Sequence, residues 1–185
     1  MKVLAFAASN SRQSINQALV KYSGEVLKDL DSSVEVEVLD LNDYEMPIYS
    51  IDRENAAGIP LEAQRFFNRV READALVISF AEHNGSYTVA YKNLFDWASR
   101  IDMKVYQGKP VVLLSASPGP GGGQNVLRAA ERSMPFFGAT VVGSLSVGPF
   151  GEKFDAEAKR LVDGDIDAEL RGALNKLTLE KAAAA

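Results

Sequence analysis

Side chains that can bind an anion cluster in the nine-residue stretch A-S-N-S-R-Q-S-I-N, residues 8–16. Ser9, Ser11 and Ser14 carry hydroxyl groups, and Asn16 carries an amide. The stretch follows an apolar run and opens a segment of helical period, so these donors gather where unpaired backbone N–H groups and the helix dipole attract anions. One side chain is enough to cap a helix, so we predict a phosphate site here, with capping alone as the alternative.

A second polar cluster follows the apolar run at 74–80. It consists of Glu82, His83, Asn84, Gly85 and Ser86, and His83 is the only histidine of the chain. The Asn-Gly-Ser turn is expected to expose successive backbone amides just before a helix that starts near Tyr87 or Thr88. Amides in this arrangement can hold a planar heterocycle and stabilise negative charge that forms on it.

The histidine in this cluster invites a catalytic role. Acyl transfer is disfavoured because the chain has no G-x-S-x-G elbow to present a nucleophile. Metal binding by Glu82 and His83 is disfavoured because two adjacent ligands give neither the number nor the geometry that a metal requires. A histidine that contacts a ligand and one that is simply exposed are the alternatives that remain.

A third loop, S-A-S-P-G-P-G-G-G at 115–123, is rich in glycine. Ser117, Gly119 and Gly122 would let the backbone pass close to a flat ligand or adopt positive φ, and an ordinary flexible loop is the alternative. The chain has no G-x-x-x-x-G-K-[ST] motif, and no G-x-G-x-x-G follows the first apolar run. These absences argue against a nucleoside triphosphatase and against a Rossmann dinucleotide site.

The elements that must position these loops follow from the hydrophobic pattern. Strands are expected at 2–7, 34–40, 74–80, 110–116 and 140–147, and helices at 14–30, 60–72, 88–101, 122–137 and 154–178. This alternation predicts an α/β fold with a parallel sheet covered by helices on both faces. The alternating V-E-V-E-V of the second strand indicates an edge position, whereas the continuously apolar first, third and fourth strands are central.

The predicted architecture is a flavodoxin-like three-layer sandwich with a five-stranded parallel sheet of order 2-1-3-4-5. In such a sheet ligands bind beyond the carboxyl ends of the strands, near the point where the strand order reverses. The loops after the first, third and fourth strands should therefore converge on one crevice. The longest irregular segment is expected at 41–59, after the second strand.

Length and composition limit the class of protein. The chain has 185 residues, 46% of them hydrophobic, which predicts one domain over 1–178 and a disordered or frayed tail at 179–185. A net charge of −5 argues against a nucleic-acid or anionic-membrane partner. The absence of cysteine excludes disulfides, thiolate nucleophiles, Fe–S clusters and zinc–sulfur sites. The N-terminal apolar run is too short for a bilayer span or a signal peptide, so a cytoplasmic location is expected.

The motifs together resemble those of the NADPH-dependent FMN reductase family, which includes azo-, quinone- and chromate-reducing enzymes. The family pattern G-S-x-R-x-x-S-x-N is similar to the stretch at 8–16, where the serines and the asparagine match. The patterns P-E-Y-N-G-S and L-K-N-x-x-D-W are similar to A-E-H-N-G-S at 81–86 and Y-K-N-L-F-D-W at 91–97. M-P-I-Y-S at 46–50 and the glycine-rich loop also match, so the resemblance covers residues 1 to about 148.

The resemblance implies an FMN site. It assigns Ser9, Ser11, Ser14, Ile15 and Asn16 to the phosphate and ribityl end, Glu82, His83, Asn84, Gly85 and Ser86 to the isoalloxazine, and Ser117, Gly119 and Gly122 to the other side of that ring. Arg12 is either a contact for the phosphate of a nicotinamide cofactor or a solvated arginine. The sequence departs from the family at Ala81, where the family has Pro, and at His83, where it has Tyr.

The implied activity is hydride transfer from NADPH or NADH to flavin N5, and from there to a small acceptor such as a quinone, azo compound, metal oxyanion or free flavin. No side-chain acid or base and no metal is required. The alternatives are a flavodoxin-like electron carrier and a non-catalytic FMN-binding protein or anion sensor. The wide apolar arc of the helix at 88–101 predicts a homodimer or homotetramer, unless Tyr91 and Phe95 fold under the 41–59 loop.

Overall fold

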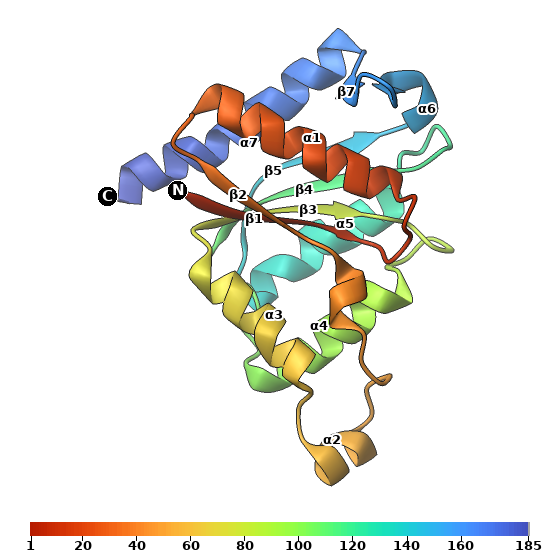
Figure 1. The fold of residues 1–185 in the computed structure, drawn as a ribbon, viewed down its shortest axis with the longest axis vertical. Coiled ribbons are helices and arrows are strands. Elements are labelled where there is room, and N and C mark those ends of the chain that lie inside the picture. The colour runs from red at the N-terminus through yellow and green to blue at the C-terminus, as the bar shows by residue number, and fades with distance from the viewer. Residues whose placement is uncertain (185) are drawn as a thin grey trace.

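The computed structural model describes the backbone of residues 1–184 and the side chains of residues 1–179. One five-stranded sheet organises the chain (Figure 1). Its strands are β1 (Lys2–Ala8), β2 (Glu35–Leu39), β3 (Ala75–Phe80), β4 (Pro110–Ala116) and β5 (Thr140–Val147), all parallel and in the order β2-β1-β3-β4-β5. The predicted strand order is confirmed. β2, the alternating strand, lies at an edge as expected.

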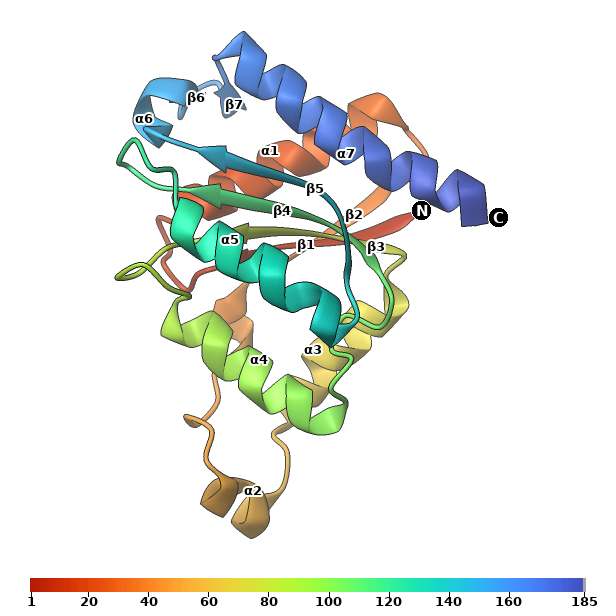
Figure 2. The same ribbon diagram turned by 180° about the vertical axis from the view of Figure 1, so that it is seen from behind.

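Helices cover both faces of the sheet (Figures 1 and 2). α1 (Ile15–Leu30) and α7 (Gly164–Ala184) pack on one face, and α3 (Leu61–Glu72), α4 (Val89–Ile101) and α5 (Gln124–Ser133) pack on the other. Because successive side chains of a strand point to opposite faces, β1 contributes to both layers: Val3, Ala5 and Ala7 face α1 and α7, and Leu4, Phe6 and Ala8 face the opposite layer. The three-layer sandwich is therefore confirmed.

The segment expected to be one helix at 154–178 differs from the prediction. The short helix α6 (Phe150–Lys153) is followed by a hairpin of β6 (Phe154–Asp155) and β7 (Arg160–Leu161), and α7 begins only at Gly164. Phe154 pairs with Leu161 in this hairpin, and both are buried. The Asp155 carboxylate accepts hydrogen bonds at 2.8 Å from the amides of Glu157 and Ala158, which fixes the turn. These contacts stabilise the hairpin, so this part of the chain does not form the helix that its hydrophobic period predicts.

The tail expected at 179–185 stays a prediction. The helical backbone of α7 continues to Ala184, and residue 185 lies outside the described residues. None of the described helices is long and apolar enough to cross a membrane.

The segment at 41–59 contains a 3-10 turn, Leu41–Tyr44, and a helix, α2 (Ile51–Ala57), neither of which was expected. α2 has no buried residue and protrudes from the body of the molecule (Figures 1 and 2). The predicted helix at 122–137 is also divided, because α5 ends at Ser133 and a 3-10 turn, Met134–Phe137, follows it. Pro135 lies in this turn and cannot continue the α-helical hydrogen bonds.

The aromatic side chains of α4 are largely covered by the chain itself. Trp97 is 1% exposed, and its Nε1 donates a hydrogen bond to the carbonyl of Pro47 at 2.7 Å. The alternative to an oligomer was that Tyr91 and Phe95 fold under the 41–59 segment, and they do not. The Tyr91 ring stacks on Phe95 and the Phe95 ring stacks on Tyr106, with 6.1 Å between the ring centroids of each pair. The 41–59 segment thus covers Trp97, and the opposite side of α4 packs toward residues 106–137.

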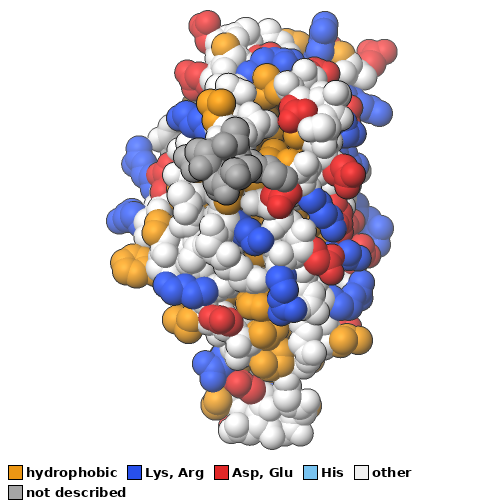
Figure 3. All heavy atoms as spheres, turned by 90° about the vertical axis from the view of Figure 1, so that its left-hand side faces the viewer, with side chains coloured by type: hydrophobic (Ala, Val, Ile, Leu, Met, Phe, Trp, Pro, Cys, Tyr) orange, Lys and Arg blue, Asp and Glu red, His pale blue; other side chains and the backbone are white. Residues whose placement is uncertain are grey.

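The edge that holds the amino ends of the strands carries interspersed acidic and basic side chains (Figure 3). Lys2 pairs there with Glu37 at 3.1 Å and with Glu72 at 3.6 Å, and Arg69 pairs with the same two carboxylates at 3.4 and 3.2 Å. These charges balance one another locally. The polar loops singled out from the sequence all lie at the other edge.

Candidate functional site

The loop between β1 and α1 is held by its own serines. The Ser9 hydroxyl accepts from the Ser11 amide at 3.2 Å, Ser11 from the Gln13 amide at 3.3 Å, and Ser14 from the Gln17 amide at 3.2 Å. Capping by Ser14 is therefore confirmed. Each hydroxyl accepts a bond from the backbone and keeps its own proton, so each can still donate to a ligand.

The first turn of α1 adds backbone donors. Its first helical hydrogen bond runs from the Ala18 amide to the Ser14 carbonyl at 3.2 Å, so the amides of Ile15 and Asn16 precede the helical ladder. The helix dipole points its positive end at the same place. Hydroxyl protons, free amides and a partial positive charge together match the requirements of a phosphate group.

The side chain of Asn16 has a structural task that the sequence did not indicate. It is 2% exposed; its Nδ2 donates to the Ala116 carbonyl at 3.1 Å, and its Oδ1 accepts from the Ala116 amide at 2.9 Å and from the Ser79 hydroxyl at 2.8 Å. The side chain thus joins α1 to β4 and β3. A cofactor contact by Asn16 stays a prediction, and its backbone amide is the group best placed to make one.

The loop after β3 is a tight two-residue hairpin turn. His83 and Ser86 form a β-bridge, with amide-to-carbonyl hydrogen bonds of 3.0 and 3.1 Å, and the two central residues have positive φ, 53° at Asn84 and 76° at Gly85. Positive φ at both positions defines a type I′ turn, for which Asn-Gly is a preferred sequence. One expectation is corrected: the Ser86 amide is used inside the turn, so only the amides of Asn84 and Gly85 remain for a ligand.

Glu82 reaches across to the next loop. Its Oε2 accepts from the Val126 amide at 3.0 Å, and its Oε1 accepts from Asn125 Nδ2 at 3.2 Å. Val126 lies in the first turn of α5, whose N-cap is Gly123 and provides no capping side chain. Glu82 therefore supplies that cap from another loop, and a direct flavin contact by its carboxylate stays a prediction.

The glycine-rich loop after β4 is more constrained than a flexible connection. The fully buried Ser115 hydroxyl donates to the Gly122 carbonyl at 2.7 Å, and the Ser117 hydroxyl donates to the Gly119 carbonyl at 3.1 Å. Gly122 has a φ of 57°, and a Cβ there would overlap Ser146 Oγ and lie 3.0 Å from the Val147 carbonyl carbon. Gly122 thus has the positive φ that was predicted, and its backbone lies close to the end of β5. A close approach of this loop to a flat ligand stays a prediction.

Three hydrogen-bonded joints bring the loops together. Asn16 links the first loop to the end of β4, and Glu82 links the third-strand loop to α5. The Thr88 hydroxyl, which caps α4, donates to the carbonyl of Ala8 at 2.9 Å and links α4 to the end of β1. The predicted convergence of the three loops at one edge is confirmed.

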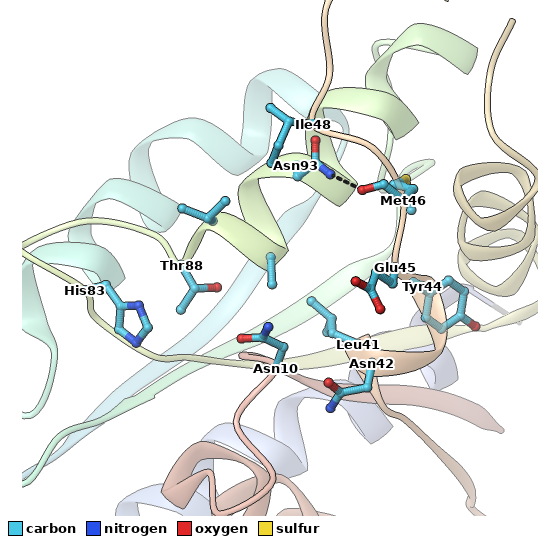
Figure 4. A pocket seen from close by; sticks show the side chains of 12 residues that line it. Asn10, Leu41, Asn42, Tyr44, Glu45, Met46, Ile48, His83, Thr88 and Asn93 are labelled. Atoms are coloured by element: carbon cyan, nitrogen blue, oxygen red, sulfur yellow. Dashed lines mark hydrogen bonds between the residues drawn. The ribbon is translucent and has the colours of Figure 1, made fainter. Parts of the chain in front are cut away.

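A cavity of about 300 Å³ opens beside this junction (Figure 4). It is lined by Asn10, Leu41, Asn42, Tyr44, Glu45, Met46, Ile48, His83, Thr88, Val89, Ala90 and Asn93. His83 is exposed and lies at one end of it (Figure 4). Apart from His83, none of these residues was among the predicted site residues, because the sequence gives the 41–59 segment no periodic pattern. Three of the quoted motifs contain lining residues all the same: M-P-I-Y-S holds Met46 and Ile48, the stretch at 8–16 holds Asn10, and Y-K-N-L-F-D-W holds Asn93.

The outer wall of this cavity is fixed to α4. Asn93 Nδ2 donates to the carbonyls of Met46 and Pro47 at 3.2 and 3.1 Å, and Asn93 Oδ1 accepts from the Tyr49 amide at 2.8 Å. The Tyr49 ring meets Trp97 edge-on, with centroids 5.0 Å apart. These contacts hold the segment against α4, where it forms a wall of the crevice.

The tyrosines behind the third-strand loop stay protonated at neutral pH. Burial is the largest cause that raises the pKa of Tyr87 and the pKa of Tyr91, and the neighbouring Tyr106 hydroxyl adds to the effect at Tyr91. Among the described side chains, no group of three or more His, Asp or Glu is placed to hold a metal ion.

Comparison with known proteins places this geometry in a family. The chain is 34% identical over 119 residues to an NAD(P)H-dependent FMN reductase of Pseudomonas aeruginosa, covering 64% of this chain and 61% of that protein. It is 31% identical over 125 residues to an NAD(P)H:quinone oxidoreductase of Solanum tuberosum, covering 68% and 63%. The matched stretch thus spans less than two thirds of either relative.

The fold also matches a solved structure over nearly its whole length. The flavoenzyme NAD(P)H:(acceptor) oxidoreductase FerB of Paracoccus denitrificans superposes with a TM-score of 0.71 at 24% identity, covering 95% of this chain and 94% of that one. The family model for NADPH-dependent FMN reductases matches residues 1–152, which include every loop of the crevice. The chain belongs to the NADPH-dependent FMN reductase family.

Proposed function

We propose that the protein is an FMN-dependent NAD(P)H oxidoreductase that reduces a small acceptor. The observation that carries the proposal is the joining of the anion-binding loop before α1 to the type I′ turn after β3, through the Thr88–Ala8 bond. A flavin mononucleotide has a phosphate at one end and a planar ring at the other, so it requires both features at one edge. When bound, FMN supplies the redox chemistry, accepting hydride from NAD(P)H and delivering electrons to a second substrate.

The residues of the chain have separate tasks in this proposal. The hydroxyls of Ser9, Ser11 and Ser14 and the amides of Ile15 and Asn16 hold the phosphate. The amides of Asn84 and Gly85 donate to the polar edge of the ring, where reduction adds negative charge. Ser117 and Gly119 line its other side.

Three further side chains act on or near this site. Asn16 and Glu82 hold the loops in register, and His83, where the family has Tyr, flanks the ring and faces the cavity of Figure 4. Arg12 is exposed beside the phosphate-binding serines and adds positive charge there. Because His83 replaces the family's Tyr at one end of this cavity, this residue is the first candidate for a difference in substrate preference.

A quinone is the first acceptor of the proposal, since several relatives, among them the one from Solanum tuberosum, are named for quinone reduction. Azo compounds, metal oxyanions and free flavin are the other acceptors of the proposal. The cavity between the 41–48 segment and α4, with Met46, Ile48 and Val89 in its lining, offers apolar surface for a flat molecule next to the ring.

The proposal includes a homodimer or homotetramer and a cytoplasmic location. Support for the assembly comes from Met103 and Phe136, which are 60% and 76% exposed. Met103 lines a cavity of about 310 Å³ between α4 and α5, and Phe136 is next in sequence to Phe137, which also lines it. Sedimentation equilibrium tests it, and a monomer at every concentration would contradict it. Support for the location is the cysteine-free composition, which needs no oxidising compartment.

The test of the activity is a reconstitution. Protein saturated with FMN should keep its visible flavin absorption through gel filtration, and should oxidise NADPH or NADH faster when 1,4-benzoquinone is added. FMN bound without any NAD(P)H oxidation would indicate an electron carrier instead. A protein that stays colourless after reconstitution would indicate a non-catalytic anion sensor.

A further inference from the structure

A second cavity, of about 640 Å³, lies between α1 and the segment that carries α6 and the β6–β7 hairpin. Figure 1 shows this segment beside the N-terminal end of α1. The volume falls within the ~300–1,000 Å³ that is typical of small-molecule sites. The proposed function uses only the residues of this cavity that belong to the phosphate-binding loop, and it leaves the rest of the cavity without a role.

The cavity is continuous with the phosphate-binding loop. Arg12, Gln13 and Ser14 line it, and Ser14 is the cap of α1 whose hydroxyl we assign to the FMN phosphate. A ligand held at that loop by a phosphate therefore has open space on the far side of the phosphate.

Unpaired positive charge surrounds this space. Arg12, Lys21 and Lys159 all line the cavity, and within the described part of the chain none of their three side chains has a hydrogen bond or an ion pair. Glu25, the acidic lining residue, is already paired with Lys28 at 3.2 Å. In a chain of net charge −5, three uncompensated cations at one cavity favour an anionic ligand.

The inner surface of the cavity is aromatic. Phe150 stacks on Phe154 with centroids 4.7 Å apart and planes at 18°, and Tyr22 meets Phe154 edge-on at 6.2 Å. The Tyr22 hydroxyl is held by Asp167 at 2.5 Å, so its ring is fixed in place. Such a surface suits a flat aromatic ring.

We propose that this cavity takes the AMP half of FAD, so that the chain binds FAD as well as FMN. The inference rests on the proposed placement of the FMN phosphate at the first loop. FAD is FMN extended at that phosphate by adenosine monophosphate. A flavin held by its FMN half would carry its second phosphate past Arg12, between Lys21 and Lys159, and its adenine onto the surface formed by Tyr22, Phe150 and Phe154.

Calorimetric titration of the apoprotein with FMN and with FAD tests whether the lysines of the cavity bind the AMP half of FAD. Lys21→Glu and Lys159→Glu should each weaken FAD binding about five- to tenfold and change FMN binding less than twofold, because FMN ends before it reaches these side chains. Lys176→Glu, which changes the net charge equally at an exposed and unpaired position on α7, is the control and should affect neither flavin.

Two tryptophan variants test whether FAD needs the space of this cavity. Ala156 lines the cavity, and Ala158 lies exposed in the same turn without lining it. Ala156→Trp should therefore exclude FAD while Ala158→Trp should not, and both variants should bind FMN.

FMN binding without FAD binding in the wild-type protein overturns the FAD assignment and leaves the proposed function standing. Lysine variants that keep FAD affinity but raise KM for NADPH also overturn it, and place the dinucleotide there instead. Failure to bind either flavin overturns both proposals.

Discussion

The carboxylate of Glu82, at the end of β3, accepts a hydrogen bond of 3.0 Å from the backbone amide of Val126, in the first turn of α5. The two residues are 44 positions apart in the sequence. The bond ties the turn that we assign to the flavin ring to the loop that we assign to its other side. The spacing of these two loops therefore depends on one side chain that need not touch a ligand.

Glu82→Ala should separate this positioning from ligand contact. Loss of a helix cap costs about 1 kcal/mol of stability, and FMN affinity should fall with it because the two loops lose their joint. Glu82→Gln, which keeps an acceptor for the Val126 amide, should retain most of both. Urea unfolding and FMN titration measure the two quantities. The control is Glu131→Ala on α5, because the Glu131 side chain has no hydrogen bond within the described part of the chain. Equal losses in both alanine variants would refute the positioning role.

Ser14→Asp tests the phosphate assignment without loss of the helix. Aspartate caps helices as well as serine does, so stability should not fall. Its negative charge would lie against the phosphate, so FMN affinity should drop severely, by about 100-fold or more if the charges are within a few ångströms. Ser14→Asn, a neutral cap, should bind FMN far more tightly than Ser14→Asp does. Equal affinity of the two variants would place the phosphate elsewhere.

Asn16→Ala should be costly for the fold. The variant leaves the Ala116 amide and carbonyl and the Ser79 hydroxyl without their partner in a buried place, and each unsatisfied buried group costs about 1–3 kcal/mol. We expect a loss of about 2–4 kcal/mol in the free energy of unfolding. The same exchange at the exposed Asn68 of α3 should change stability by less than about 0.5 kcal/mol. A small loss at Asn16 would mean that the three-way joint is dispensable.

Gly122→Ala should also destabilise, because the added Cβ meets the end of β5 and the backbone has positive φ. Gly121→Ala is a matched control one residue away, since a Cβ there meets nothing within 4 Å. We expect Gly122→Ala to cost about 1–3 kcal/mol and the control to cost little in thermal or urea unfolding. Equal stability of the two variants would show that the loop shifts freely.

The sequence predicts the strands that position the site better than it predicts the small elements and the residue contacts around it. The strands at 110–116 and 140–147 were found at the predicted bounds, since continuous apolar runs in a parallel sheet are hard to mistake. The hairpin at 154–161 was missed, because its two strands are two residues each and carry no period of their own. α2 was missed because it buries nothing, so no apolar stripe marks it.

Individual roles in the site depend on partners that are distant in sequence. Asn16 and Glu82 stand in motifs that suggested ligand contacts, yet their hydrogen-bond partners lie 100 and 44 residues away, at Ala116 and Val126. Only the folded chain shows these partners. The turn at 84–85 is the opposite case: Asn-Gly specifies its own positive φ angles, so local sequence was enough to predict it.

Alkaline pH should weaken the fold through a pair of buried tyrosines. Tyr91 and Tyr106 are 3% and 1% exposed, and their hydroxyls hydrogen-bond to each other at 2.5 Å. Burial raises the pKa of both above the usual value of 10. In the unfolded chain both would ionise near pH 10, whereas in the native state both keep their protons. The native state therefore binds more protons than the unfolded chain above that pH. The stability that the pair contributes is fully present below about pH 10 and is lost as the pH rises further.

Urea midpoints measured from pH 8 to pH 11 should fall less steeply in the double variant Tyr91→Phe/Tyr106→Phe, which keeps the rings and removes both hydroxyls together. Parallel curves for the variant and the wild-type protein would show that these tyrosines do not control the alkaline limit.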